Sequence, residues 1–128
     1  MFSELTDNIK VIVETAFKPN PNRLQGGEFI FAYRVTIENY SEHRIQLLRR
    51  HWFIAECSGL KREVEGIGVV GEQPIIEASD FHQYMSYCNL NSEIGKMYGY
   101  FTMLRHTDGQ QFKIKIPEFR MIVPYRLN

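Results

Sequence analysis

The sequence predicts an all-β domain in which two antiparallel sheets pack face to face as a sandwich. Apolar and polar residues alternate with a period of two along the chain, and no segment has the period of 3.6 residues typical of an amphipathic helix. Turn signals at regular spacing divide the chain into about seven to eight short strands, which is typical of sandwiches, with a barrel as the alternative. The 128 residues fit a single domain over 1–128, because no linker or internal repeat interrupts the pattern.

Three strands are predicted in the first half of the chain. Residues 9–17 alternate clearly, and residues 29–38 form the strongest strand, with aromatic and β-branched side chains on one face. The prolines, asparagines and glycines within 19–27 predict a loop between these two strands. Residues 45–57 predict a third strand with a kink near Arg49, where the alternation loses its phase.

The second half of the chain is predicted to hold the remaining strands. Residues 62–71 contain three glycines and favour a loop or a broken edge strand. Asp108-Gly109 predicts a hairpin turn, because this pair readily adopts the positive φ that tight turns need. Pro117 is expected to end the last strand, and the residues from Arg120 onward form a candidate tail without a clear period. The strands expected here are 81–88, 97–104 and 112–116.

The apolar phase of the strands predicts which residues form the core. A lone tryptophan on such a strand often fills the centre of a sandwich, and we expect this role for Trp52. The alternative is a stacking surface at Trp52 with Arg50 as an anion clamp. The other residues expected to be buried are Phe31, Tyr33, Val35, Ile54 and Phe101.

Charge and cysteine content narrow the classes of partner. Lys plus Arg is 15 and Asp plus Glu is 15, so the chain lacks the basic excess of nucleic-acid-binding proteins, and no such partner is expected. The longest run without these charged residues, Phe81–Ser92, is too short and too polar for a membrane span, so no membrane partner is expected. The N-terminal residues show no secretory signal, so Cys57 and Cys88 are expected to be free thiols in the cytoplasm.

Several segments, taken together, resemble the ApaG family in their order and spacing. The resemblance rests on Leu47–Ile54, Val64–Pro74, Tyr84–Ser86, Cys88, Gly95, Met97, Gly99, Tyr100, Met103 and Ile116–Phe119. It implies a fibronectin type III-like or immunoglobulin-like sandwich, usually a free-standing cytoplasmic protein in bacteria, with no established catalytic activity. Two features depart from the family pattern: Tyr87 stands where small residues are common, and the tail after Phe119 is long.

The resemblance also widens the functional expectations. Similar domains appended to eukaryotic F-box proteins and to a polymerase-associated protein imply an interaction module. Bacterial relatives are often encoded beside a diadenosine tetraphosphate hydrolase, and the family has been linked to cobalt and magnesium tolerance. These associations imply a connection with dinucleoside polyphosphates or with divalent-cation homeostasis.

The segment Gly66-x-Gly68-x-x-Gly71 matches the dinucleotide-binding GxGxxG fingerprint as a string of letters. The fingerprint binds pyrophosphate only where it opens a helix, whose N-terminal amides receive the anion. Here Glu72-Gln73-Pro74 follows the last glycine, and no helical period comes after it. A dinucleotide-binding domain is therefore not expected.

A weaker interpretation is that the backbone amides of loop 66–71 form a nest for a phosphoanion. Arg50 and Arg62 would supply the countercharge, whereas Glu63, Glu65 and Glu72 flank the same loop and would repel phosphate. The competing interpretation is a purely structural bulge or tight turn that needs glycine for its backbone.

No catalytic residue, metal ligand or cofactor site is predicted, because the histidines form no close pair and the cysteines lack metal-site spacing. The sequence favours a non-enzymatic protein-interaction module with an unidentified protein partner, and self-association remains a further option. The alternative function is binding or sensing of a small phosphoanion, such as pyrophosphate, a nucleotide or a dinucleoside polyphosphate. The candidate residues for that alternative are Gly66, Gly68, Gly71, Arg50 and Arg62.

Overall fold

The fold is all-β, as the alternation predicts. The computed structural model describes residues 1–19 and 27–127, so the loop predicted at 19–27 lies almost wholly outside the described residues. Within those two ranges, no helix has the length and apolar character needed to cross a bilayer. The described elements are β1 Phe2–Thr6, β2 Ile9–Lys18, β3 Phe29–Asn39, β4 Ile45–Glu56, β5 Lys61–Ile67, β6 Ile75–Ile76, β7 Phe81–Leu90, β8 Ile94–Arg105, β9 Gln111–Ile122 and the 3₁₀ helix η2 Pro124–Leu127.

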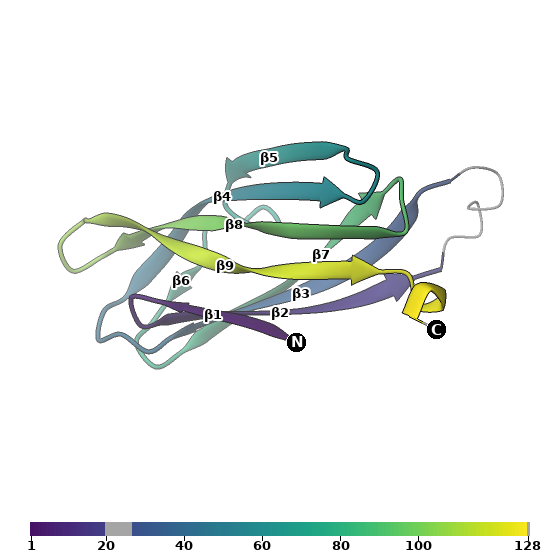
Figure 1. Cartoon of the computed structure of the whole chain (residues 1–128). Coiled ribbons are helices and arrows are strands. Elements are labelled where there is room, and N and C mark those ends of the chain that lie inside the picture. Colours follow the sequence, from purple (N-terminus) through teal and green to yellow (C-terminus); the bar gives the residue numbers. More distant parts are fainter. Residues whose placement is uncertain (20–26, 128) are drawn as a thin grey trace.

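Two antiparallel sheets form the sandwich (Figure 1). The first sheet has the strand order β1-β2-β3-β7, and the second has the order β5-β4-β8-β9 with β6 paired to the start of β4. The predicted sandwich of antiparallel strands is therefore confirmed. The nine strands of the described ranges exceed the seven or eight predicted, because β1 is only half-buried and β6 has two residues.

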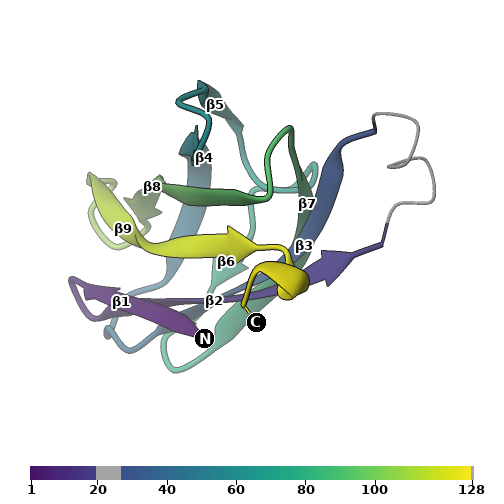
Figure 2. The same cartoon turned by 45° about the vertical axis from the view of Figure 1, so that its right-hand side comes forward.

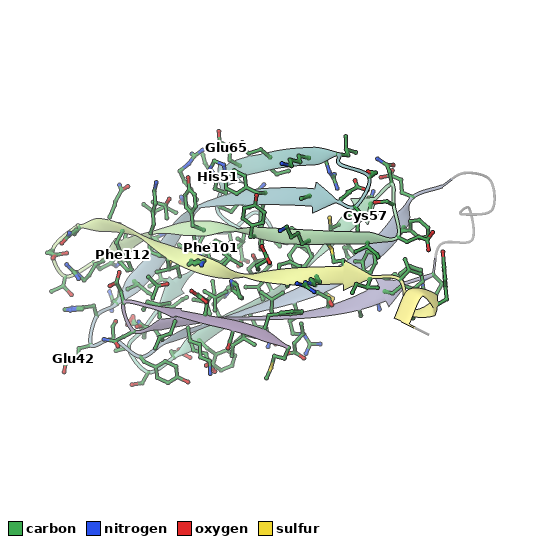
Figure 3. The ribbon with its side chains drawn as sticks, in the orientation of Figure 1. Glu42, His51, Cys57, Glu65, Phe101 and Phe112 are labelled. Atoms are coloured by element: carbon green, nitrogen blue, oxygen red, sulfur yellow. The ribbon has the colours of Figure 1, made fainter. Side chains whose placement is uncertain are left out.

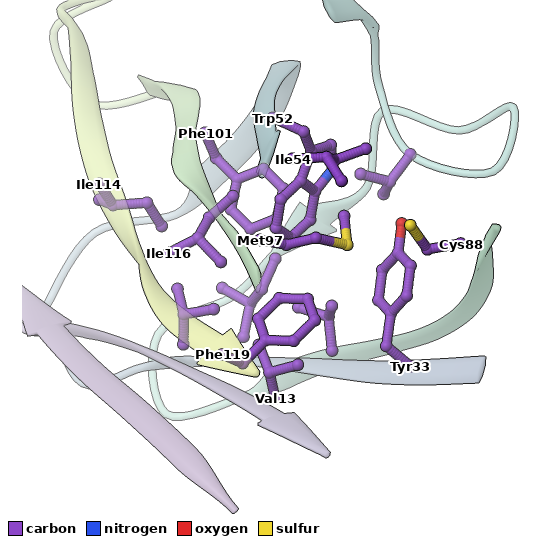
Figure 4. Packing of buried hydrophobic residues seen from close by; sticks show 14 of the residues in the cluster. Val13, Tyr33, Trp52, Ile54, Cys88, Met97, Phe101, Ile114, Ile116 and Phe119 are labelled. Carbon is purple, nitrogen blue, oxygen red and sulfur yellow. The ribbon is translucent and has the colours of Figure 1, made fainter. Parts of the chain in front are cut away.

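The core lies between the sheets, and its residues are those on the apolar phase of each strand. All six residues predicted to be buried, Trp52 among them, are buried. The Trp52 indole makes edge-to-face contacts with Tyr33, Phe101 and Phe119, with ring centroids 5.6, 6.1 and 5.8 Å apart (Figure 4). Core packing, rather than an exposed stacking surface, is therefore the role of Trp52.

A bulge in β4 explains the loss of phase predicted near Arg49. The register of β4 against β8 shifts between Leu47 and Arg49. Before the bulge, Ile45 and Leu47 are buried; after it, the buried positions are Trp52, Ile54 and Glu56. The shift turns Arg50 to the same side of the sheet as Trp52, toward the space between the sheets.

The prediction that Pro117 ends the last strand is wrong. Strand β9 continues through Pro117 to Ile122. Its register against β8 shifts between Met97 and Gly99, and Pro117 lies at this irregularity. The regular ladder of hydrogen bonds is already interrupted there, so the missing N–H of proline is tolerated. Beyond it Phe119 and Met121 are buried, so the first part of the candidate tail belongs to the core.

The two long sides of the sandwich differ. On one side β1 and β2 pack against β9, where the backbone N–H of Lys115 donates to the Thr6 hydroxyl over 3.2 Å. On the other side lie the edge strands β5 and β7, which stand apart in Figure 2 and pair with no further strand in the described ranges. The sandwich is therefore closed along β1 and β9 and open along β5 and β7.

Candidate functional site

The open side of the sandwich contains a cleft of about 800 Å³. A volume of this size falls in the range of small-ligand and peptide side-chain pockets. The floor is apolar and consists of Trp52, Ile54 and Met97 beside Tyr33, which Figure 4 shows around the indole. One wall is the stretch 84–89 of β7, and the other is β5 with the loop that follows it.

Strand β7 presents a long uncharged edge beside this cleft. Its ten residues include no Asp, Glu, Lys or Arg, and it pairs only with β3. Phe81, Met85 and Tyr87 on its outer face are 59, 46 and 61% exposed. Soluble proteins usually protect such an edge with charges, proline or a covering element. The only sequence signal for this feature is the uncharged run Phe81–Ser92, which sequence analysis used solely to exclude a membrane span.

Strand β5 turns Arg62 and Val64 toward the cleft and its two carboxylates away from it. Arg62 and Val64 pair with Ile54 and Trp52, so they share the inner face of the second sheet. Glu63 and Glu65 project from the outer face, where their carboxylate oxygens lie 2.7 and 3.2 Å from the ring nitrogens of His51 (Figure 3).

This placement changes the balance of charge expected around the loop. The carboxylates of Glu63 and Glu65, expected to repel an anion, lie on the far face of β5, and Glu72 does not line the cleft. The expected flanking repulsion is therefore largely removed. The segment 62–71 itself is an edge strand up to Ile67 and a tight turn beyond it.

Arg50 lies inside the cleft and holds the loop. Its Nη1 donates to the carbonyl oxygens of Ile67 and Gly68 over 3.0 and 2.9 Å. The guanidinium lies directly over Gly66, where a Cβ atom would be 3.0 Å from Nη2. A side chain at position 66 would therefore crowd the Arg50 guanidinium, which would have to shift.

The backbone conformation of the loop explains why glycine occupies two of its other positions, Gly68 and Gly71. Val69 and Glu72 exchange backbone hydrogen bonds around a turn whose central residues, Val70 and Gly71, have φ of 48° and 76°, as in a type I′ turn. Gly68 has φ of 65°, and a Cβ atom there would lie 2.2 Å from the Glu72 carbonyl oxygen. The segment is thus a tight turn that needs glycine for its backbone, as the structural interpretation expected.

The amides of the loop are partly used inside the protein. The N–H of Gly68 donates to Leu48 O, and the N–H of Val69 donates to Glu72 O, each over 2.8 Å. A nest for phosphate needs such groups to point at the ligand. The loop therefore offers fewer free donors than its three glycines suggest.

Arg62 joins the two walls of the cleft. Its Nη2 donates to the backbone carbonyl of Asn89 on β7 and lies 3.7 Å from the Cys88 sulfur. The structure therefore brings Arg50 together with Gly66, Gly68 and Gly71, whereas Arg62 occupies the same cleft but reaches the opposite wall.

Two tyrosine hydroxyls form a polar group inside the cleft that sequence reasoning missed. Burial raises the pKa of Tyr33 and raises the pKa of Tyr84 well above 10.0; a hydrogen bond to Ser86 lowers that of Tyr33. The positive charge of Arg50 lowers both values, so it acts on both hydroxyls. Among the described residues the Tyr84 hydroxyl has no hydrogen-bond partner. Alternation of β7 indicated the inward direction of Tyr84 but not its missing partner.

Neither the cysteine in the wall of the cleft nor a cluster of metal ligands adds a reactive group to the described part of the chain. Cys57 is exposed, Cys88 is buried in the wall of the cleft, and both are free. Burial raises the pKa of Cys88, which keeps the thiol protonated and unreactive. In residues 1–19 and 27–127, no three His, Cys, Asp or Glu side chains are grouped so as to hold a metal ion.

Comparison with known proteins gives consistent results. The family described as the ApaG domain matches residues 19–105. A protein named ApaG from Anaeromyxobacter dehalogenans is 40% identical over 128 residues, which is 100% of both chains.

Two solved structures share the fold. An X-ray structure of a structural genomics target has a TM-score of 0.87 at 35% identity, covering 92% of this chain and 89% of its own. The crystal structure of a Bordetella pertussis protein named ApaA has a TM-score of 0.85 at 33% identity, covering 91% of this chain and 94% of its own. None of these names specifies a reaction.

Proposed function

The chain belongs to the ApaG family, and on this premise we propose that it is a non-enzymatic, cytoplasmic interaction module that adds an extended segment of a partner protein to the free edge of β7. The observation that carries the proposal is the uncharged, ten-residue edge of β7, which pairs with β3 alone in the described ranges. An edge of this kind is a template for an additional strand.

The backbone of β7 has its free hydrogen-bonding groups in the right place. The Asn89 carbonyl accepts a bond from Arg62 of the opposite sheet, so it points away from β3. Because these groups alternate along an antiparallel ladder, those of Gln83, Met85 and Tyr87 point the same way. A partner strand pairing with these three residues would satisfy all of their unpaired backbone groups.

The side chains beside this edge also favour a protein partner. Met85 and Tyr87 offer apolar contact area on the outer face of β7. On the opposite wall Val64, Ile67 and Val70 are exposed as well. Apolar side chains gathered around one cleft are typical of interaction sites, since isolated ones would be scattered over the surface.

The test is a peptide-display selection with the whole chain as bait, followed by NMR of the ¹⁵N-labelled chain with the enriched peptides. We expect enriched peptides to show intermolecular backbone contacts with Gln83, Met85 and Tyr87. The double variant Met85→Lys, Tyr87→Lys should abolish binding, because lysine on an edge blocks strand addition. No enrichment, or peptides that contact another surface, would overturn the proposal.

Two controls separate edge pairing from loss of the fold. Leu5→Lys places a lysine at a similarly exposed position on the other edge strand of the same sheet, and it should leave binding unchanged. Tyr87→Pro removes only an outward N–H and should block binding, whereas Ser86→Pro removes an N–H used by β3 and should unfold the sheet. A second copy of the chain on β7 would appear as concentration-dependent dimerisation that the lysine variant removes.

A second candidate function is binding of a small phosphoanion, and one observation favours it. Arg50 and Arg62 both line the cleft, and neither has a carboxylate within ion-pair distance among the described residues. The test is NMR titration with pyrophosphate, ATP and diadenosine tetraphosphate, with and without magnesium. Saturable shifts around Gly66, Gly68 and Gly71 that Arg50→Gln removes would support this candidate; unshifted loop resonances would end it.

A further inference from the structure

The Tyr84 hydroxyl is a buried polar group in need of a partner. Its oxygen is shielded from solvent and has no hydrogen bond in the described part of the chain. Buried hydroxyls are nearly always hydrogen-bonded, since leaving one unpaired destabilises the fold. Such a group facing a cleft indicates a ligand that supplies the missing acceptor.

Arg50, which lines the same cleft, has no carboxylate within ion-pair distance in the described ranges. Its hydrogen bonds there come from Nη1 and go to the neutral carbonyls of Ile67 and Gly68. A guanidinium has five N–H donors, so Nε and Nη2 remain to donate elsewhere. Its charge acts on the hydroxyls of Tyr84 and Tyr33, which places all three groups in one neighbourhood of the cleft.

We propose that Tyr84 and Arg50 form a subsite for a carboxylate side chain of the partner strand, an inference that rests on the strand-addition function proposed above. A strand paired with β7 would direct every second side chain to the same side as Tyr84 and Ser86. Directly opposite side chains in an antiparallel pair have Cβ atoms about 5 Å apart. A Glu or Asp at such a position would reach into the cleft.

The surroundings define the chemistry of this side chain. An ionised carboxylate only accepts hydrogen bonds, so it matches the O–H of Tyr84 and the N–H groups of Arg50. The carboxylates of the neighbouring strand β5, Glu63 and Glu65, already face its outer side with His51. The floor of Trp52, Ile54 and Met97 calls for apolar side chains at the neighbouring inward positions.

The experiment compares two peptide-display libraries of extended decamers that differ at one central position, fixed as Glu in one and as Gln in the other. We expect Glu peptides that contact β7 to bind at least about tenfold more tightly than their Gln counterparts, because charge-assisted hydrogen bonds in a shielded site are strong. Equal affinity of Glu and Gln peptides at the β7 edge would overturn the subsite while preserving strand addition. Absence of β7-edge binders from both libraries would overturn strand addition itself.

A variant then assigns the effect to the Tyr84 hydroxyl. Tyr84→Phe keeps the ring and should weaken Glu peptides about tenfold while leaving Gln peptides unchanged. Leu5→Lys, remote on β1, serves as the matched control and should change neither. Inorganic pyrophosphate is added as a competitor: no displacement of the Glu peptide at equal concentration is expected, and displacement by pyrophosphate would show a site for free phosphoanions instead.

Discussion

At the scale of single residues, the Trp52 indole is the centre of the aromatic core. It contacts Tyr33, Phe101 and Phe119 and is almost fully buried. We expect Trp52→Ala to lower the free energy of unfolding by about 3–5 kcal/mol, because the truncation leaves a cavity between the sheets. Denaturant unfolding measures this loss, and an unchanged midpoint would contradict the role given to Trp52.

Removal of the Tyr84 hydroxyl should change the free energy of unfolding in the opposite direction. Because it is buried without a partner, Tyr84→Phe should raise the free energy of unfolding, by up to about 1 kcal/mol. Tyr33→Phe is the control: it removes a hydroxyl hydrogen-bonded to Ser86 and should lower stability by about 1 kcal/mol. Equal losses from both substitutions would show that the Tyr84 hydroxyl is satisfied in solution.

Sequence analysis succeeded for residues whose role follows from strand phase alone. The burial of Trp52 and Phe101 was predicted because alternation fixes which face a side chain occupies. The presence of Tyr84 and Arg50 in one cleft was not predicted, because it depends on β4 and β7 belonging to opposite sheets. The loop glycines were singled out correctly, but the guanidinium that lies over Gly66 comes from another strand.

At the scale of elements, the hairpin between β8 and β9 contains a pH-dependent interaction between Arg105 and Asp108. The pKa of Asp108 is held at about 2, below the ordinary 3.8, first by a hydrogen bond from Arg105 and second by the backbone N–H of Gln110. This contribution to stability is present above pH 3.8 and is lost as pH falls toward 2. NMR titration of the Asp108 carboxyl should give a midpoint near 2, and the midpoint should rise toward 3.8 in Arg105→Gln. A wild-type midpoint at 3.8 would show that Arg105 does not stabilise the ionised carboxylate.

The turn after β5 depends on both conformation and space at Gly68. Gly68 and Gly109 have similar φ, 65° and 73°, but only at Gly68 would a Cβ atom meet a backbone oxygen, at 2.2 Å. Gly109→Ala should lower the free energy of unfolding by about 1 kcal/mol, the cost of a left-handed backbone. Gly68→Ala should lower the free energy of unfolding clearly more, because of the contact with the Glu72 carbonyl oxygen. Equal losses in thermal unfolding would show that this contact adds no cost.

The elements show where local pattern fails to predict a strand. Proline marks the end of a strand only where the ladder is regular, and the bulge in β9 at Pro117 lets the strand continue. Strand β6 exists because β4 extends past the end of β5 and offers a vacant edge at Ile45 and Gln46. These features depend on the partner strand, which a single segment does not encode.

At the scale of the whole molecule, the open side should be the least protected. Strand β5 is exposed along its length and pairs only with β4, whereas β8 lies between two strands and carries buried side chains. Local opening follows such differences in burial and pairing. Amide hydrogen exchange should therefore be faster in β5 than in β8, and equal protection would show that the two sheets open only together.

The closed side of the sandwich has a consequence for how the domain can be built into longer chains. The first strand, β1, packs against the last, β9, so both terminal strands of the described chain lie on the closed side of the sandwich (Figures 1 and 2). A neighbouring domain fused at either end would leave the cleft uncovered. The same fold can thus stand alone or form one domain of a multidomain protein, with the free edge of β7 accessible in both arrangements.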